Sequence, residues 1–207
     1  IYDSNRYVLH GLLQTLGCEI VDLGLVGDNL QATKAAMLEA SQRADLVITS
    51  GGVSVGEEDH VRIAIEQLGD LHLWRLRMKP GKPLAFGSIN QTPFLGLPGN
   101  PVSAFVNFLL FACPLIKTIQ GRVWEQPVPI PVSAGFDWPR PDSRREFTRA
   151  RLEYDDKNKL VARIFAKQDS GVLTSTAWAQ GLVEIGEDQT LKYGDPVGYL
   201  SFADLLS

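Results

Sequence analysis

The sequence predicts a doubly wound, mostly parallel α/β domain followed by a small all-β domain. Between residues 4 and 120, stretches with helical apolar spacing alternate with short apolar runs, which is the pattern of repeated βα units. After Gly121 the helical spacing ends, and Pro127, Pro129 and Pro131 lead into short strand-like runs. These observations place the α/β domain at residues 1–122 and the β domain at residues 127–207.

The elements of the first domain follow from apolar spacing and from stop signals. Helical spacing predicts three helices, at residues 4–16, 29–43 and 60–68. Gly17 is a typical stop for the first helix. Short apolar runs predict five strands, at residues 19–23, 45–49, 71–76, 84–86 and 94–97. Asn100 and Pro101 then begin a long apolar helix to Gln120, with a kink expected at Pro114.

The second domain shows strand-like runs without long helical spacing. These runs predict five strands, at residues 130–134, 147–154, 160–165, 182–185 and 197–202. A domain of about 80 residues is near the lower size for independent stability, so we expect it to pack on its neighbour.

Composition excludes some classes of function. A net charge of -4 and a pI near 5.4 provide no broad positive field, which argues against binding to nucleic acid or to an anionic membrane. The longest apolar run, residues 105–116, is too short to span a bilayer and is expected to be a buried helix. Cys18 and Cys113 both lie in apolar stretches, as small core residues do in a reducing compartment, so we expect a cytoplasmic protein without a disulfide.

The first segment that could carry chemistry is Thr49-Ser-Gly-Gly-Val-Ser-Val-Gly-Glu-Glu-Asp59. Its glycines let the backbone approach a ligand and expose N–H groups to phosphate or another oxyanion. Carboxylates directly after such a loop would repel phosphate unless a cation such as Mg²⁺ lies between them, which makes Asp59 a candidate metal ligand. The alternative is a plain strand-to-helix turn that Asp59 caps.

Asp28 could supply a second carboxylate for the metal. It follows the predicted strand at residues 19–23, within Gly27-Asp-Asn-Leu-Gln31. The spacing of Asp28 and Gln31 also matches a capping box, so the purely structural reading remains open.

The second segment is Met78-Lys-Pro-Gly-Lys-Pro83, in which two prolines hold Lys79 and Lys82 on a turn. Rigid presentation lowers the entropic cost of binding an anion with both charges. The alternative is a solvated basic loop between two strands.

The third segment is Gly96-Leu-Pro-Gly-Asn-Pro-Val-Ser103, a turn that leads into the start of the long helix. Unpaired N–H groups and the helix dipole favour an anion there, and Ser103 adds a hydroxyl in the first turn. Simple capping by Asn100 is the alternative. In the β domain, arginines cluster around Glu146, and most such side chains pair with nearby acids at the surface. They are Arg144, Arg145, Arg149 and Arg151.

Taken together, the three ordered motifs resemble those of the molybdopterin molybdenumtransferase family, which includes bacterial molybdenum insertases and the E domain of gephyrin. The opening Ile1-Tyr-Asp-Ser-Asn5 and the later Arg145-Glu-Phe-Thr-Arg-Ala also resemble segments of this family, so the similarity covers essentially the whole chain. The resemblance implies an α/β domain of the molybdenum-cofactor-biosynthesis type. It also implies insertion of molybdate into adenylylated molybdopterin with Mg²⁺ and release of AMP.

The resemblance assigns roles to the motif residues. Asp28 and Asp59 would handle Mg²⁺ at the phosphates, while Lys79, Lys82 and Ser103 would contact molybdate or the pterin phosphate. Arg144 and Ser170 would reach the oxyanion from the β domain. The nucleotide-pterin would be held by the two loops, through Ser50, Gly51, Gly52, Ser54, Gly56, Pro98, Gly99 and Asn100.

The chain also departs from the family pattern. Family members carry an N-terminal half, and a strand ending in an acidic Thr-Gly-Asp-Glu motif precedes the segment that matches Ile1. Neither is in this sequence, so we expect the α/β sheet to lack its first strand and these residues alone to be inactive. Family members are homodimers, so we expect a homodimer that also meets other proteins of the cofactor pathway.

Two other functions remain open from the sequence. A single-domain molybdopterin adenylyltransferase would share the α/β domain, but the appended β domain argues against it. A peptide-binding scaffold, as in gephyrin, is the other alternative, although no segment resembles a peptide groove.

Overall fold

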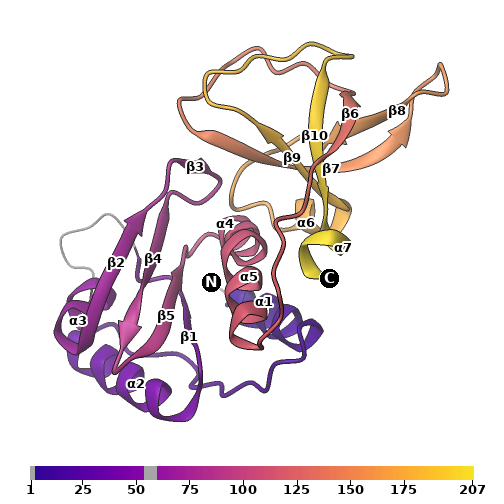
Figure 1. Ribbon diagram of the computed structural model, residues 1–207. Helices are drawn as coiled ribbons and strands as arrows, with labels where there is room; N and C mark the ends of the chain where they lie inside the picture. The colour runs from indigo at the N-terminus through magenta and orange to yellow at the C-terminus, as the bar shows by residue number, and fades with distance from the viewer. Residues whose placement is uncertain (1–2, 54–59) are drawn as a thin grey trace. The chain divides into compact units, whose positions relative to one another are not determined.

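The chain forms two compact units (Figure 1). The structure, a computed structural model, describes residues 3–53 and 60–207, without the side chain of Trp74. The first unit comprises Ile1–Leu76 and Gly81–Val123, and the second comprises Arg77–Pro80 and Trp124–Ser207. The predicted fold class is confirmed, since a mixed α/β unit is joined to a β-rich unit.

The first unit is built around a four-stranded sheet with helices on both faces (Figure 1). The strand order is β1-β5-β4-β2. The strands are β1 (Val47–Ser50), β2 (Gly69–Arg75), β4 (Pro83–Ile89) and β5 (Thr92–Leu97). The helices are α1 (Ser4–Thr15), α2 (Leu30–Arg43), α3 (His60–Leu68), α4 (Pro101–Asn107), η1 (Phe108–Ala112) and α5 (Cys113–Ile119).

This sheet is mixed rather than mostly parallel across its described strands. Strand β1 pairs with β5 in parallel, whereas β4 pairs with β5 and β2 in the antiparallel sense. A tight turn explains the difference, because Asn90 and Gln91 both have positive φ and connect β4 directly to β5 as a hairpin. The apolar core against α2 and α3 includes Met37, Ile65 and Phe94.

The ends of the first two helices follow from their sequences. Helix α1 stops where predicted, because Gly17 adopts φ +73 and its N–H donates to the carbonyl of Gln14. Helix α2 is capped by Asn29, whose Oδ1 accepts from the N–H of Ala32 at 2.8 Å. The predicted capping box of Asp28 and Gln31 is therefore wrong, because the cap lies one residue later.

The predicted strand at residues 19–23 is not formed. Residues 18–27 belong to no helix or strand, and none of the described strands pairs with them. A strand needs a neighbouring backbone to accept its hydrogen bonds. The apolar residues that suggested the strand, Ile20, Val21 and Leu23, are only half-buried.

The long apolar helix runs continuously from Pro101 to Ile119 and contains a π-helical segment instead of a simple kink at Pro114. Pro114 has no N–H and its ring crowds the carbonyl four residues earlier. The π segment η1 lies just before it, with the N–H of Cys113 donating to the carbonyl of Phe108, five residues back. By length and composition this helix could span a membrane, but 61% of an 18-residue stretch of it is buried in the protein, as in a core helix.

The second unit is a six-stranded sheet with short helices at its connections. Its order is β3-β7-β8-β6-β10-β9, and an additional pairing of β7 with β9 closes the sheet on itself. All five predicted strands of the β domain are confirmed. The strands are β3 (Met78–Lys79), β6 (Ile130–Ala134), β7 (Arg145–Tyr154), β8 (Leu160–Ile164), β9 (Gly181–Ile185) and β10 (Pro196–Ser201). The helices are α6 (Thr174–Trp178) and α7 (Phe202–Leu206).

Candidate functional site

Two of the predicted motifs meet at one edge of the first sheet. Because β1 and β5 are parallel and Ser50 is opposite Leu97, their carboxyl ends lead into loops that lie side by side. The N–H of Gly51 donates to the carbonyl of Leu97 at 3.0 Å. A β-carbon on Gly51 would lie 3.9 Å from the α-carbon of Gly99, so the two loop backbones are in contact.

Glycine is required at the first of these loops. Gly51 and Gly52 have φ values of +85 and +71, a region that other residues rarely adopt. A β-carbon on Gly52 would also lie 2.6 Å from Cγ2 of Val61 in α3. This backbone conformation is the one expected for a loop that presents N–H groups to an anion.

Asn5 joins the two loops, a role that the sequence analysis did not assign to it. Its Nδ2 donates to Oγ of Ser50 at 2.6 Å and to the carbonyl of Gly99 at 2.8 Å. Asn5 lies in the first turn of α1 and is buried. The available signal was its position, since a polar residue on the buried face of an amphipathic helix needs hydrogen-bonding partners.

Two buried polar atoms at this edge have unmet hydrogen-bonding capacity among the described residues. Oδ1 of Asn5 and Oγ1 of Thr49 have no hydrogen-bonding partner within the described residues. Buried polar atoms are nearly always satisfied by protein, water or ligand. Oδ1 of Asn5 can only accept a hydrogen bond, so a partner for it beside Ser50 has to be a donor.

The start of α4 adds an anion-binding element. Asn100 occupies the N-cap position, but its side chain makes no capping hydrogen bond, so the predicted side-chain cap is wrong. Its backbone is extended, and Pro101 begins the helix, which leaves first-turn N–H groups without a side-chain acceptor. Pro98 and Ser103 are buried beside this turn. The helix dipole and free N–H groups favour an anion here.

The predicted metal ligands are only partly described. Asp59 lies outside the described residues, as do Ser54 and Gly56 of the same loop. Asp28 is exposed, directly before the cap of α2. Across residues 3–53 and 60–207, no three His, Cys, Asp or Glu side chains gather into a metal-binding group. The magnesium site therefore stays a prediction.

The two lysines of the Lys-Pro-Gly-Lys turn fall in different units. Lys82 belongs to the first unit, where it is exposed and its carbonyl accepts from the N–H of Leu76 at 2.8 Å. Lys79 belongs to the second unit, because β3 pairs with β7 and Lys79 is opposite Glu146. The shared contact of Lys79 and Lys82 with an anion therefore stays a prediction.

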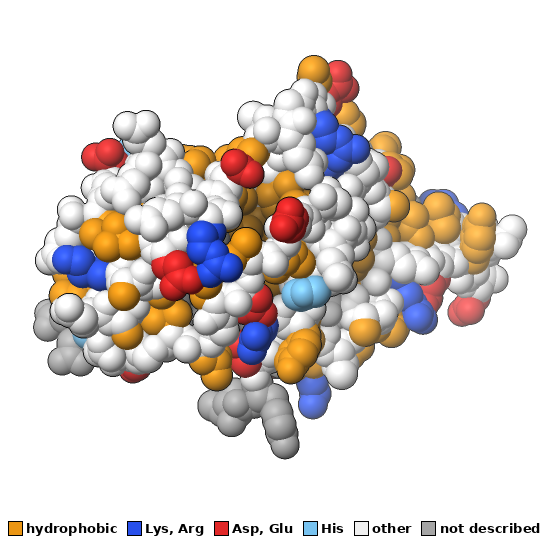
Figure 2. All heavy atoms as spheres, turned by 90° about the horizontal axis from the view of Figure 1, so that it is seen from below, with side chains coloured by type: hydrophobic (Ala, Val, Ile, Leu, Met, Phe, Trp, Pro, Cys, Tyr) orange, Lys and Arg blue, Asp and Glu red, His pale blue; other side chains and the backbone are white. Residues whose placement is uncertain are grey.

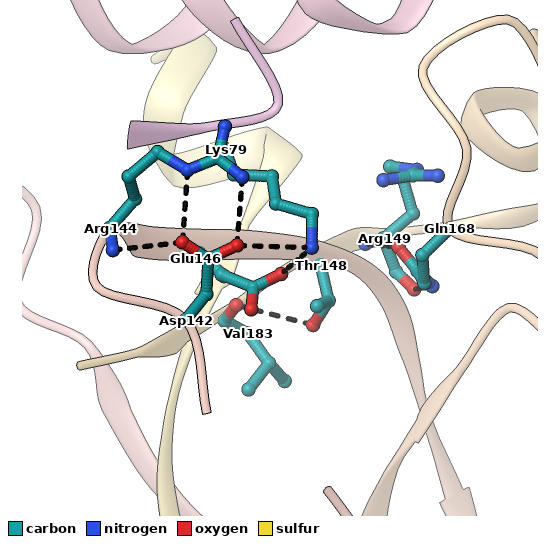
Figure 3. Close-up of polar contacts among 8 residues, drawn as sticks. All are labelled: Lys79, Asp142, Arg144, Glu146, Thr148, Arg149, Gln168 and Val183. Carbon is teal, nitrogen blue, oxygen red and sulfur yellow. Dashed lines mark hydrogen bonds and ion pairs between the residues drawn. The ribbon is translucent and has the colours of Figure 1, made fainter. Parts of the chain in front are cut away.

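Lys79 is surrounded by charged side chains of the second unit (Figure 3). Its Nζ lies 3.0 Å from Oε2 of Glu146 and 3.5 Å from Oδ2 of Asp142. Arg144 binds the same Asp142 carboxylate through Nε at 2.9 Å and Nη2 at 2.7 Å. Hydrogen bonds and charge from Arg144 hold the pKa of Asp142 well below its usual range, and Asp142 raises the pKa of Arg144 in return.

This arrangement gives Arg144 a partner within the chain. Its guanidinium forms a two-pronged ion pair with Asp142. The contact with an oxyanion that we expected of Arg144 would therefore compete with a strong intramolecular partner. The sequence analysis named Glu146 only as an acid among the arginines, and it did not name Asp142.

Arg149 is the buried arginine of this region, and it supports the loop that carries Ser170. Its Nε donates to Oγ of Ser175 at 3.0 Å, and its Nη2 donates to the carbonyls of Lys167 and Asp169 at 3.4 and 3.2 Å. Burial lowers the pKa of Arg149 to about 10. Ser170 is half-buried and directly follows Asp169.

Charged side chains of both signs lie on the face drawn in Figure 2, where they are interspersed among apolar ones.

Comparison with known proteins identifies the family. Residues 1–118 match the family described as a probable molybdopterin binding domain, and residues 131–202 match the MoeA C-terminal region, domain IV. The chain is 36% identical to the molybdopterin molybdenumtransferase of Haemophilus influenzae. The alignment covers 100% of this chain and 52% of that protein. The chain is also 38% identical to the molybdenum cofactor synthesis protein cinnamon of Drosophila melanogaster, and this alignment covers 89% of this chain and 31% of cinnamon.

A solved structure shows the same arrangement of elements. The crystal structure of the molybdopterin biosynthesis MoeA protein from Pyrococcus horikosii superposes with a TM-score of 0.78 at 31% identity, covering 98% of this chain and 48% of that one. The chain thus spans about half the length of the Haemophilus influenzae and Pyrococcus horikosii proteins and about a third of cinnamon. Both of its units have counterparts in these proteins, and the chain belongs to the molybdopterin molybdenumtransferase family, with a molybdopterin-binding domain followed by a MoeA C-terminal domain.

Proposed function

We propose that the protein containing this chain inserts molybdate into adenylylated molybdopterin, in a reaction that depends on Mg²⁺ and releases AMP. The observation that carries the proposal is the meeting of the β1 loop with the start of α4, braced by Asn5. Backbone N–H groups and a helix N-terminus gathered at one sheet edge suit the phosphate groups of an adenylylated pterin.

Each unit would supply a different part of the reaction. In the first unit, the loop from Ser50 to Gly52 and the turn from Pro98 to Ser103 would hold the nucleotide-pterin. Lys82, which is exposed, would contact molybdate or the pterin phosphate. In the second unit, Lys79, Arg144 and Ser170 would serve the oxyanion.

Magnesium fits the carboxylates available to this chain. Mg²⁺ keeps several waters and is usually bound by one or two carboxylates together with substrate phosphates, so a larger cluster is not required. Asp28 and Asp59 are the residues that would hold it. When bound, the ion would neutralise phosphate charge during release of AMP.

The test is molybdate-dependent release of AMP by the full-length protein. Purified protein is incubated with adenylylated molybdopterin and Mg²⁺, with and without molybdate, and AMP is measured by chromatography. We expect AMP to be released faster when molybdate is present, because insertion of the metal drives cleavage of the adenylyl group. AMP release at the background rate under all conditions would refute the proposal.

A matched lysine variant separates a specific effect from a loss of surface charge. Lys82→Met should weaken turnover, whereas Lys157→Met, which removes an exposed lysine from the turn after β7, should not. Equal effects of the two variants would show that Lys82 contributes only to net charge.

A further inference from the structure

Glu146 is the buried carboxylate of the Lys79 cluster, and its role is not explained by the proposed reaction. The Glu146 side chain is 5% exposed, whereas the Lys79 side chain is 41% exposed. The pair therefore joins a buried anion to a cation that solvent and ligands can reach. Such a geometry suits a buried group that orients an accessible one.

We propose that Glu146 is a positioning residue, which fixes the ammonium group of Lys79 for contact with the anionic substrate. This inference rests on the proposed function. The backbone supports it, because Lys79 and Glu146 are register partners in the β3–β7 pair. The N–H of Arg145 also donates to the carbonyl of Arg77 at 3.1 Å, and this bond ties β3 to β7 just before the pair.

The ammonium group of Lys79 has more hydrogen-bond donors than Glu146 and Asp142 use. An ammonium group has three donors. At 3.0 Å Glu146 accepts one of them, while Asp142 at 3.5 Å lies at ion-pair distance. At least one donor therefore remains for a ligand. Asp142 is already engaged by both Nε and Nη2 of Arg144, so Glu146 is the stronger anchor of Lys79.

The charges of the cluster cancel. Lys79 and Arg144 each carry a positive charge, and Asp142 and Glu146 each carry a negative one, so the sum is zero (Figure 3). These four side chains together present no surplus positive charge to an anion. The benefit of Lys79 must then come from a correctly placed donor, because a flexible lysine would lose rotamer freedom on binding.

The experiment is a double-mutant cycle in the full-length protein. Wild type, Glu146→Gln, Lys79→Met and the double variant are compared by kcat/KM for molybdate in the AMP-release assay. Glu146→Gln should lower kcat/KM by up to about 100-fold when Lys79 is present, because the donor is misplaced. In the Lys79→Met background the same change should alter kcat/KM by no more than about twofold. An equal loss in both backgrounds, or no loss in either, would overturn the proposal.

Chemical labelling provides a readout that does not depend on turnover. Acetic anhydride is added to the folded full-length protein, and acetylation of Lys79 relative to Lys82 is followed by mass spectrometry. Glu146→Gln should raise this ratio, because the lysine has lost its main partner, and Glu146→Asp should restore part of the protection. An unchanged ratio refutes the positioning role, while absence of AMP release from wild type refutes the proposed function.

Two controls exclude a general structural effect. Glu184→Gln removes the same charge from the neighbouring strand β9, where Glu184 pairs with Arg145 at 2.8 Å. Arg145 precedes Glu146 in β7 and so projects from the opposite face of the strand. This variant should keep wild-type turnover. The Lys79→Met/Glu146→Gln variant leaves no unpaired buried charge, so its folding, checked by thermal melting, keeps the cycle interpretable.

Discussion

At Gly81, both the backbone and the surrounding space require glycine. Its φ is +100, and a β-carbon there would lie 1.9 Å from Nδ2 of Asn107, a fully buried residue of α4. Asn107 donates through the same Nδ2 to the carbonyl of Ser103 at 2.8 Å, so it cannot move away cheaply. The turn that carries Lys82 is thereby packed on the helix that carries Ser103.

We predict that Gly81→Ala lowers the free energy of unfolding by at least about 2 kcal/mol, through backbone strain and the clash with Asn107. Gly11→Ala is the matched control, because nothing lies within 4 Å of a β-carbon at that position of α1. The control should stabilise the protein by about 0.5–1 kcal/mol, since alanine favours a helix over glycine. Urea unfolding of the full-length variants measures both. Similar stabilities for the two variants would contradict this account of the turn.

The residues that the sequence revealed and those that it hid differ in the range of their contacts. Gly51, Gly52 and Gly99 could be found because closely spaced glycines signal a special backbone within one loop. For Asn5 the sequence offered only a polar residue on the buried face of a helix, because its partners lie 45 and 94 residues away along the chain. Glu146 was hidden for the same reason, because its partner Lys79 lies in another motif.

At the start of helix α2, two adjacent residues have different expected roles: Asn29 caps the helix, and Asp28 is a predicted metal ligand. Asn29 supplies the cap, and Asp28 stands free of the helix with its side chain exposed. Sequence spacing had suggested Asp28 as the cap, because a capping box and a single Asn cap leave similar patterns. The two residues therefore allow a sharp comparison.

We predict that Asn29→Ala costs about 1 kcal/mol of stability, the usual loss for an N-cap, while Asp28→Ala changes stability by less than about 0.5 kcal/mol. If Asp28 is a magnesium ligand, Asp28→Ala should instead reduce Mg²⁺-dependent AMP release. Thermal or urea unfolding and the AMP assay together decide the matter. A stability loss at Asp28 as large as that at Asn29 would show that both residues cap the helix.

Helices could be predicted because their burial pattern is local in sequence. Predictions of strands failed where a strand depends on a pairing partner elsewhere in the chain. The helices at 4–15, 30–43 and 60–68 follow from apolar periodicity, which reports one buried face. The segment at 19–23 has the composition of a strand but no described neighbour to pair with. The short strand β3 was missed because two residues carry no periodic signal, although pairing with β7 defines it.

For the whole molecule, the largest departure from expectation is the assignment of Arg77–Pro80 to the second unit. These residues lie in sequence between strands of the first unit, yet β3 completes the edge of the second sheet. Apolar patterns cannot reveal such an exchange, because they report burial without naming the partner. One consequence is that Lys79 and Lys82 belong to different units.

Binding of the pterin where the Ser50 loop meets the Gly99 turn is tested by a calorimetric titration of the full-length protein with adenylylated molybdopterin at fixed ionic strength. We predict saturable binding that weakens at least about tenfold in Asn5→Leu, because the brace between the Ser50 loop and the Gly99 turn is lost. If this folded variant binds adenylylated molybdopterin more weakly both with and without molybdate, the result supports binding of the pterin at that sheet edge. Absence of saturable binding by the wild-type protein would contradict the account.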